Sequence, residues 1–89
     1  MTANGASDEP RPTPRYRQIL DAANGLARAM GHTHVGVEHL FLAIIRDGSS
    51  VPAQSLSRTA DLADLHRDFL AYMQAAYPEP FRHVPAYPE

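Results

Sequence analysis

The sequence contains no cysteine and no lysine, and each absence removes a class of chemistry. Without cysteine the chain can form no disulfide, no thiolate metal site and no thiol nucleophile. Without lysine it has neither the P-loop side chain that reaches the β- and γ-phosphates of a nucleotide nor a Schiff-base amine. All eight basic residues are arginines. We therefore expect neither a Walker-type ATPase nor a Schiff-base enzyme.

Strong charge and long apolar runs are also missing. The formal net charge is −2 over 89 residues, which provides no basic footprint for nucleic acid or for an anionic membrane. No apolar run approaches the ~20 residues of a membrane span. The first 14 residues have no apolar core and do not resemble a signal peptide. These features predict a cytoplasmic protein that binds neither nucleic acid nor membrane.

Composition divides the chain into three parts. Residues 1–12 are small and polar without periodicity, which predicts a disordered arm. Residues 77–89 hold four of the eight prolines and cannot form a regular helix. This tail repeats the tetrapeptide AYPE, found at 76–79 and again at 86–89. It could stay mobile, cover a groove of the domain or bind a partner as an extended ligand. Residues 13–76 are the expected folded domain.

Apolar spacing predicts an all-α domain of four helices. The first begins with Thr13 as N-cap and Pro14 at its first position, and ends at Gly31, which suits a positive φ. Gly25 inside it suggests a close helix crossing. Its apolar stripe comprises residues 16, 19, 20, 23, 26, 27 and 30. The second helix spans 37–47, ends before Gly48 and is apolar on nearly all sides, so we expect the other three to surround it.

The third and fourth helices have weaker patterns. The third is expected over 51–60, with Val51 and Leu56 facing inward. The fourth begins at Asp61, an N-cap residue, and cannot extend past Pro78. Its expected apolar stripe comprises residues 62, 65, 69, 72, 73 and 76.

The stretch GHTHVGVEH, residues 31–39, holds three of the five histidines. His32 and His34, completed by His39 or Glu38, form a candidate metal site, since imidazole binds zinc, copper and nickel. The other interpretation is a joint between two helices held by histidine hydrogen bonds, with His34 exposed. No serine or threonine lies in a nucleophile-elbow pattern, so we expect no catalytic residue and no cofactor.

Residues 13–56 resemble one repeat of the Clp amino-terminal domain, which caps the ClpA and ClpC unfoldases. The shared features are the opening threonine of the first helix, its IL..A...A core, the GH...G.EHL joint and the FLAIIRDG end of the second helix. With the last helix included, the resemblance extends over about residues 13–73. Only one repeat fits, and no ATPase module follows it. Pro14 and Val37 depart from the family, which often has glutamate and threonine there.

The resemblance implies a non-enzymatic module that binds client proteins or adaptors in connection with a Clp machine. In ClpC-like members each repeat can bind phosphoarginine through the first-helix threonine and the glutamate of EH, which match Thr13 and Glu38. It also implies a structural joint of Gly31, His32, Gly36 and His39, without metal. A histidine-cluster metal protein, and a homodimer that rebuilds the tandem repeat, remain the alternatives.

Overall fold

A computed structural model describes residues 9–76 and 86–88. Its helices are α2 (Pro14–Ala29), α3 (Val37–Asp47), α4 (Val51–Ser57) and α5 (Leu62–Ala76), and the described residues contain no strand. The predicted all-α fold is confirmed. Most of the predicted arm, residues 1–8, and most of the tail, residues 77–85 and 89, lie outside the described residues.

The ends of α2 and α3 lie where the sequence places them. The Thr13 hydroxyl accepts a hydrogen bond from the Tyr16 N–H at 3.1 Å, and Pro14 follows it in the first turn. Gly31 and Gly48 end α2 and α3 with φ values of 81° and 73°. Only glycine adopts this left-handed conformation at little cost, so these two residues set where the helices stop.

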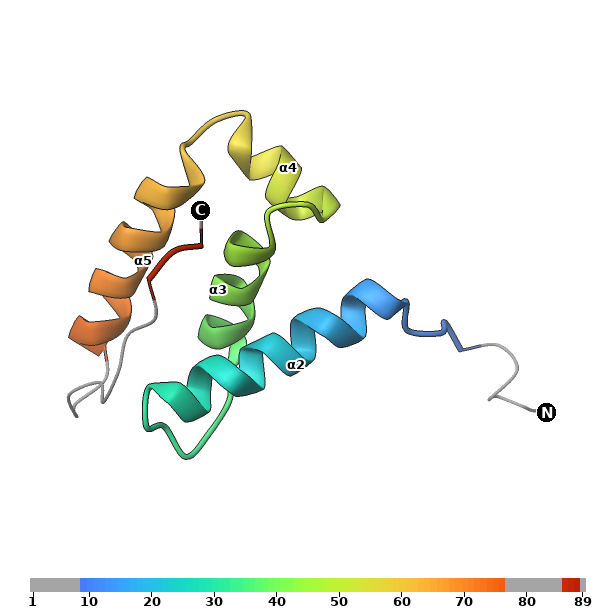
Figure 1. Ribbon diagram of the computed structural model, residues 1–89, viewed down its shortest axis with the longest axis horizontal. Helices are drawn as coiled ribbons and strands as arrows, with labels where there is room; N and C mark the ends of the chain where they lie inside the picture. The colour runs from blue at the N-terminus through green and yellow to red at the C-terminus, as the bar shows by residue number, and fades with distance from the viewer. Residues whose placement is uncertain (1–8, 77–85, 89) are drawn as a thin grey trace.

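Helix α3 lies at the centre of the fold (Figure 1). It packs against α2, α4 and α5, and α4 with α5 is the other pair of described helices in contact. Leu42 and Ile45 are fully buried in it, which explains its unbroken apolar run. The main core cluster joins α2, α3 and α5 through residues Ile19, Ala23, Leu26, Met30, Leu42, Ala43 and Met73. The expectation of a second helix contacted by the other three is confirmed.

Four residues expected to face inward are exposed instead, and Ala76 at the end of α5 is one of them. Val51 is 78% exposed because it starts α4 and points outward, while Ala53 packs against the core in its place. Tyr72 is 76% exposed and Tyr16 is 54% exposed. Both tyrosines lie at the edge of the apolar stripes of their helices. Helical periodicity alone does not tell whether a neighbouring helix covers a residue at that position.

Two further expectations are corrected. Gly25 marks no close helix crossing, since a Cβ built on it would have no atom within 4 Å. Helix α4 ends at Ser57 instead of continuing to residue 60, because the Thr59 and Ala60 N–H groups both donate to the Leu56 carbonyl and close a turn there.

Alanine substitutions at Gly25, inside α2, and at Gly48, after α3, should change the free energy of unfolding in opposite directions. Gly48→Ala should lower the free energy of unfolding by about 1–2 kcal/mol, because alanine would be forced into the left-handed region. Gly25→Ala should raise it by about 0.5–1 kcal/mol, because alanine is the better helix former and has room here. Urea unfolding of both variants beside the wild type checks the pair. Equal effects of the two substitutions would contradict the assigned roles.

Candidate functional site

The joint between α2 and α3 begins with a backbone motif. The Gly31 N–H donates to the Arg28 carbonyl at 3.0 Å, and the His32 N–H donates to the Ala27 carbonyl at 2.9 Å. With Gly31 in the left-handed conformation, this pair of bonds is a Schellman motif, which satisfies carbonyls that the end of a helix leaves unpaired. This motif reverses the direction of the chain after α2, and it brings the His32 side chain to the first turn of α3.

His39 holds the joint together from inside the first turn of α3. Its ring is fully buried, and its Nδ1 accepts the Gly36 N–H at 3.0 Å. Nδ1 therefore carries no proton, and Nε2 donates to Nδ1 of His32 at 2.8 Å. His39 thus reaches back to the N-cap backbone as glutamate does in a capping box, at a cap where Gly36 offers no side chain. The predicted histidine hydrogen bonds are present.

The environment of His39 favours its neutral ring. Burial is the main cause that lowers the pKa of His39, and the neighbouring His32 lowers it further. The carboxylate of Glu38 acts in the opposite direction and raises that pKa. The neutral ring can accept the Gly36 N–H, whereas a protonated ring cannot. Glu38 and His39 are therefore electrostatically coupled although they are neighbours on different sides of the helix.

The metal interpretation does not fit this arrangement. Both ring nitrogens of His39 are engaged, and Nδ1 of His34 lies 3.1 Å from the Thr33 hydroxyl on the exposed side of the loop. Over residues 9–76 and 86–88, no three histidine or acidic side chains are grouped so that they could hold a metal ion.

Thr13 is the N-cap residue of α2, and Glu38 belongs to the first turn of α3. Glu38 is half-buried in the first turn of α3, and its Oε1 lies 2.7 Å from the position that a Cβ would take on Gly36. A hollow formed partly by Leu20 and Val37 places that turn beside the middle of α2. Thr13 lies seven residues before Leu20, about 10 Å along the helix axis. Exposed Tyr16 stands between them.

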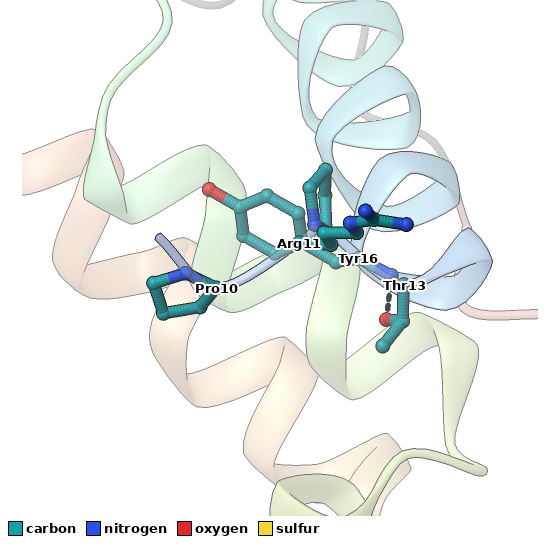
Figure 2. A pocket seen from close by; sticks show the side chains of 5 residues that line it. Pro10, Arg11, Thr13 and Tyr16 are labelled. Atoms are coloured by element: carbon teal, nitrogen blue, oxygen red, sulfur yellow. Dashed lines mark hydrogen bonds between the residues drawn. The ribbon is translucent and has the colours of Figure 1, made fainter. Parts of the chain in front are cut away.

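A second hollow surrounds the start of α2. It is lined by Pro10, Arg11, Pro12, Thr13 and Tyr16, and Figure 2 shows the Tyr16 ring forming one wall. Thr13 is exposed here, and the first turn of α2 contains no acidic residue. A hydroxyl, an arginine and the positive end of a helix therefore gather on one surface, an arrangement that favours an anion. Arg11 was expected in the disordered arm and Tyr16 in the apolar stripe of the first helix, so neither residue was expected at this hollow.

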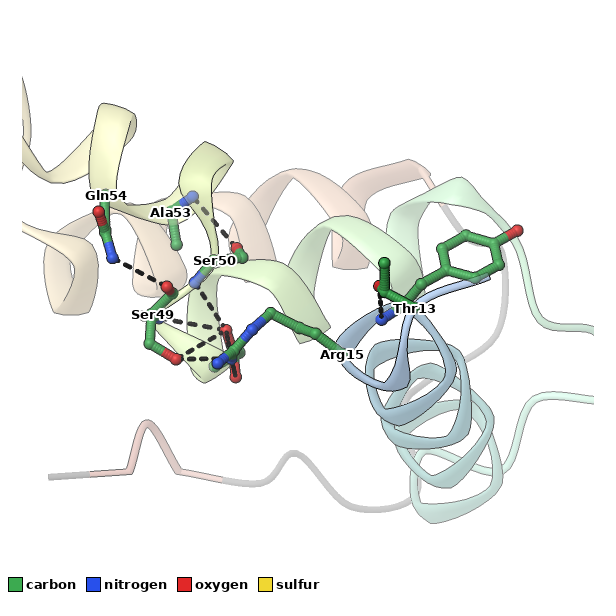
Figure 3. Close-up of polar contacts among 8 residues, drawn as sticks. Thr13, Arg15, Ser49, Ser50, Ala53 and Gln54 are labelled. Carbon is green, nitrogen blue, oxygen red and sulfur yellow. Dashed lines mark hydrogen bonds and ion pairs between the residues drawn. The ribbon is translucent and has the colours of Figure 1, made fainter. Parts of the chain in front are cut away.

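Asp47 fixes the start of α2 to the end of α3 and was also missed. Its carboxylate accepts bonds from Arg15 at 2.9 and 3.1 Å and from the Ser50 N–H at 3.0 Å (Figure 3). Arg15 also donates to the Ser49 hydroxyl at 2.7 Å. The charge of Arg15 is therefore directed away from Thr13. An Arg and an Asp separated by 32 residues leave no pattern in a sequence that would reveal this pairing.

The Asp47 carboxylate is held in its ionised form. Burial raises the pKa of Asp47, but the Ser49 N–H, the Arg15 guanidinium and the Ser50 N–H together outweigh that effect. The net result is a pKa below the ordinary value of an aspartate. The connection between α3 and α4 is built around this one charge, since Ser49 and Ser50 both donate to it.

The model of one protein family, the Clp repeat (R) N-terminal domain, matches residues 1–59. The match therefore includes α2, α3 and α4 and stops before α5. No solved structure matches the chain significantly. Among the described residues, no helix has the length and apolar character needed to cross a membrane.

Several curated proteins are similar to the chain over about half of its length. A ClpA homolog of Guillardia theta, named as an ATP-binding subunit of the ATP-dependent Clp protease, is 42% identical over 48 residues, 54% of this chain and 6% of the relative. The chaperone protein ClpB of Oceanobacillus iheyensis is 40% identical over 45 residues, 51% of this chain and 6% of the relative. The negative regulator of genetic competence ClpC/MecB of Bacillus subtilis gives the same figures, 40%, 45 residues, 51% and 6%. The chain thus spans a small fraction of these relatives.

His39 should make the stability of the fold depend on pH. Its folded-state pKa lies below the unfolded value of 6.5, so protonation favours the unfolded chain. The free energy of unfolding should therefore fall as the pH drops from 7 through the folded-state pKa. His39→Gln should cost about 1–3 kcal/mol at pH 7, because it disrupts a buried hydrogen-bond pair, and should show a flatter pH profile.

Urea unfolding at several pH values between 5 and 7 checks this expectation. His34→Gln is the matched control, since His34 is exposed and should keep the wild-type profile. An unchanged pH profile in His39→Gln would contradict the assignment. Some slope remains in that variant because burial also lowers the pKa of His66.

Asp47 should stabilise the fold in a more acidic range. Its folded-state pKa is depressed, so its contribution is present above the unfolded value of 3.8 and is lost as the pH falls through the folded-state pKa. Asp47→Asn should cost about 1–2 kcal/mol at pH 7, and that cost should shrink toward pH 2. Arg15→Gln should cost less, about 0.5 kcal/mol, because that ion pair is partly exposed. A cost for Asp47→Asn that is equal at pH 7 and pH 2 would show that its charge is unimportant.

Proposed function

The chain belongs to the Clp repeat N-terminal domain family, and on this basis we propose that it is a non-enzymatic module that binds proteins in connection with a Clp-type machine. Its partners in this proposal are client proteins or adaptors. The observation that carries the proposal is the joint at residues 31–39, where the family's GH...G.EHL pattern coincides with a folded joint that presents Glu38 at the start of α3.

The apolar part of the same face suits a protein partner. Leu20, Val35, Val37 and Leu40 line a hollow between α2 and α3, and Val37 is 73% exposed. Exposed apolar side chains grouped around a hollow are typical of surfaces that bind other proteins. A second copy of the chain would use the same surface in the homodimer alternative.

The polar part suits a phosphorylated guanidinium group. Glu38 supplies a carboxylate for the guanidinium, a pairing that is strengthened by charge. Thr13, the first turn of α2 and Arg11 supply a hydroxyl, a helix N-terminus and a positive charge for the phosphoryl group. Pro14 removes one N–H donor from that turn, and Arg11 is the group that offsets this loss. Phosphoarginine on a client or adaptor is therefore the proposed ligand.

The pKa of His39 should change when this ligand binds. The Glu38 charge raises the pKa of His39, so a guanidinium bound to Glu38 should lower that pKa further. Titration of the ring signals by NMR, with and without the ligand, measures the shift directly.

Binding itself is tested with the ¹⁵N-labelled full chain and free phosphoarginine. We expect saturable amide shifts at Thr13, Tyr16 and Glu38, and a loss of affinity of about tenfold in Glu38→Gln, equivalent to about 1.4 kcal/mol. Thr13→Ser should bind as the wild type does, because serine keeps both the hydroxyl and the helix cap.

Asp21→Asn is the matched control for Glu38→Gln, since it removes an exposed carboxylate from α2 outside both hollows. Arginine without phosphate separates the two halves of the ligand and should bind more weakly. An affinity in Glu38→Gln equal to that of the wild type, or shifts that avoid both Thr13 and Glu38, would exclude this site. Sedimentation of the same samples shows whether the ligand binds a monomer or a dimer.

A further inference from the structure

The described part of the tail, residues 86–88, lies on a different face of the domain. Figure 1 shows it alongside α5, on the side that faces α3. Its contacts are with Arg46, near the end of α3, and with His66 of α5. A segment of the tail therefore packs on a surface that α3 and α5 form together.

The contacts involve the backbone and the aromatic ring of the segment. Arg46 of α3 donates from Nη1 to the Ala86 carbonyl at 2.8 Å. The ring of His66 on α5 meets the Tyr87 ring edge-to-face, with centroids 5.3 Å apart and planes at 64°. Arg46 Nη1 also lies 3.2 Å from Nε2 of His66, so one guanidinium joins both helices and the segment.

A hollow lies between the segment and α5. Ala86 and Tyr87 form one side of it, and the α5 residues that line the other side are Ala63, His66, Arg67, Leu70, Ala71 and Gln74. His66 is only 4% exposed, and burial followed by the Arg46 charge lowers its pKa, which keeps Nε2 available as an acceptor. Apolar side chains for an aromatic ring, next to a donor for a carbonyl, are the elements by which domains read extended, proline-containing peptides.

We propose that the surface between α3 and α5, centred on Arg46 and His66, is a peptide-binding site for an extended segment with an aromatic residue followed by proline, and that residues 86–88 of the chain occupy it in cis. The site goes beyond the proposed function, because it lies near the other end of α3, next to α5, and uses neither Thr13 nor Glu38. It holds whether or not phosphoarginine binds.

The contacts of the segment suit an exchangeable ligand. Between the described residues it makes a hydrogen bond with Arg46 and an edge-to-face ring contact with His66, and each of these is weak individually. Such a segment stays bound largely because its connection to the domain keeps its effective concentration near the millimolar range. A partner that carries the same chemistry at higher affinity would displace it. Pro88 disfavours helical backbone at Tyr87, the residue before it, and so lowers the entropic cost of binding the ring in an extended segment.

The test uses the full chain, its Tyr87→Ala variant and a synthetic peptide of residues 84–89. Tyr87→Ala should shift the amide signals of His66 and Leu70, because it removes the ring that packs on this surface. The added peptide should then reverse these shifts in a saturable way. Wild-type protein should bind the peptide at least tenfold more weakly, because its own segment competes.

Two controls test whether the Tyr87 ring itself is responsible for peptide binding. Tyr72→Ala removes an exposed tyrosine of α5 and should leave peptide binding as in the wild type. The peptide carrying Tyr87→Ala should not bind the variant. Equal affinity of the wild type and Tyr87→Ala, or the absence of saturable shifts in the variant, overturns the proposal. Loss of the folded spectrum in Tyr87→Ala also overturns it, since the segment would then be part of the core instead of a ligand.

Discussion

The burial of α3 is the constraint on which the rest of the structure depends. An 11-residue helix with a nearly continuous apolar run cannot be covered by one neighbour, so α2, α4 and α5 each take part of its surface. Because α2 contacts neither α4 nor α5 among the described helices, α3 is the element through which the others are joined. Both proposed binding faces depend on this arrangement, since each lies where a neighbour meets α3.

The histidine joint has a structural role that supports a binding role next to it. His39 uses both ring nitrogens to hold Gly36 and His32, which fixes the direction in which α3 begins. Glu38, the next residue, is thereby presented at a defined position on the face shared with α2. The same short stretch thus combines a buried neutral histidine with a partly exposed carboxylate, and the two are coupled through charge. A structural and a functional interpretation of this motif are compatible because they concern different residues.

The two ends of α3 have different surroundings. At its start the chain leaves an apolar hollow and exposed valines uncovered, and at its end Asp47 gathers Arg15, Ser49 and Ser50 into a closed network. On its other side, Arg46 and His66 already hold a segment of the tail. A single repeat therefore has one face in contact with part of its own chain and another open to a partner.

Local signals determined most of the fold. Thr13 with Pro14, Gly31, Gly48 and Asp61 each mark a helix end through backbone chemistry that acts within a few residues, and such signals are legible in a sequence. The family motif likewise predicted the joint, and it implied Glu38 as a ligand-binding residue, which stays a prediction. Only the tertiary structure decided which side of each stripe is covered: Tyr16, Val51 and Tyr72 are exposed. His66 is buried, in agreement with its spacing from Leu62 and Phe69, but a pattern of apolar residues alone left it out of the stripe of α5. The Arg15–Asp47 network and the contact of Tyr87 with His66 also belong to the tertiary structure. They join residues 32 and 21 positions apart, and pairing across such distances depends on how helices pack rather than on the order of neighbouring residues.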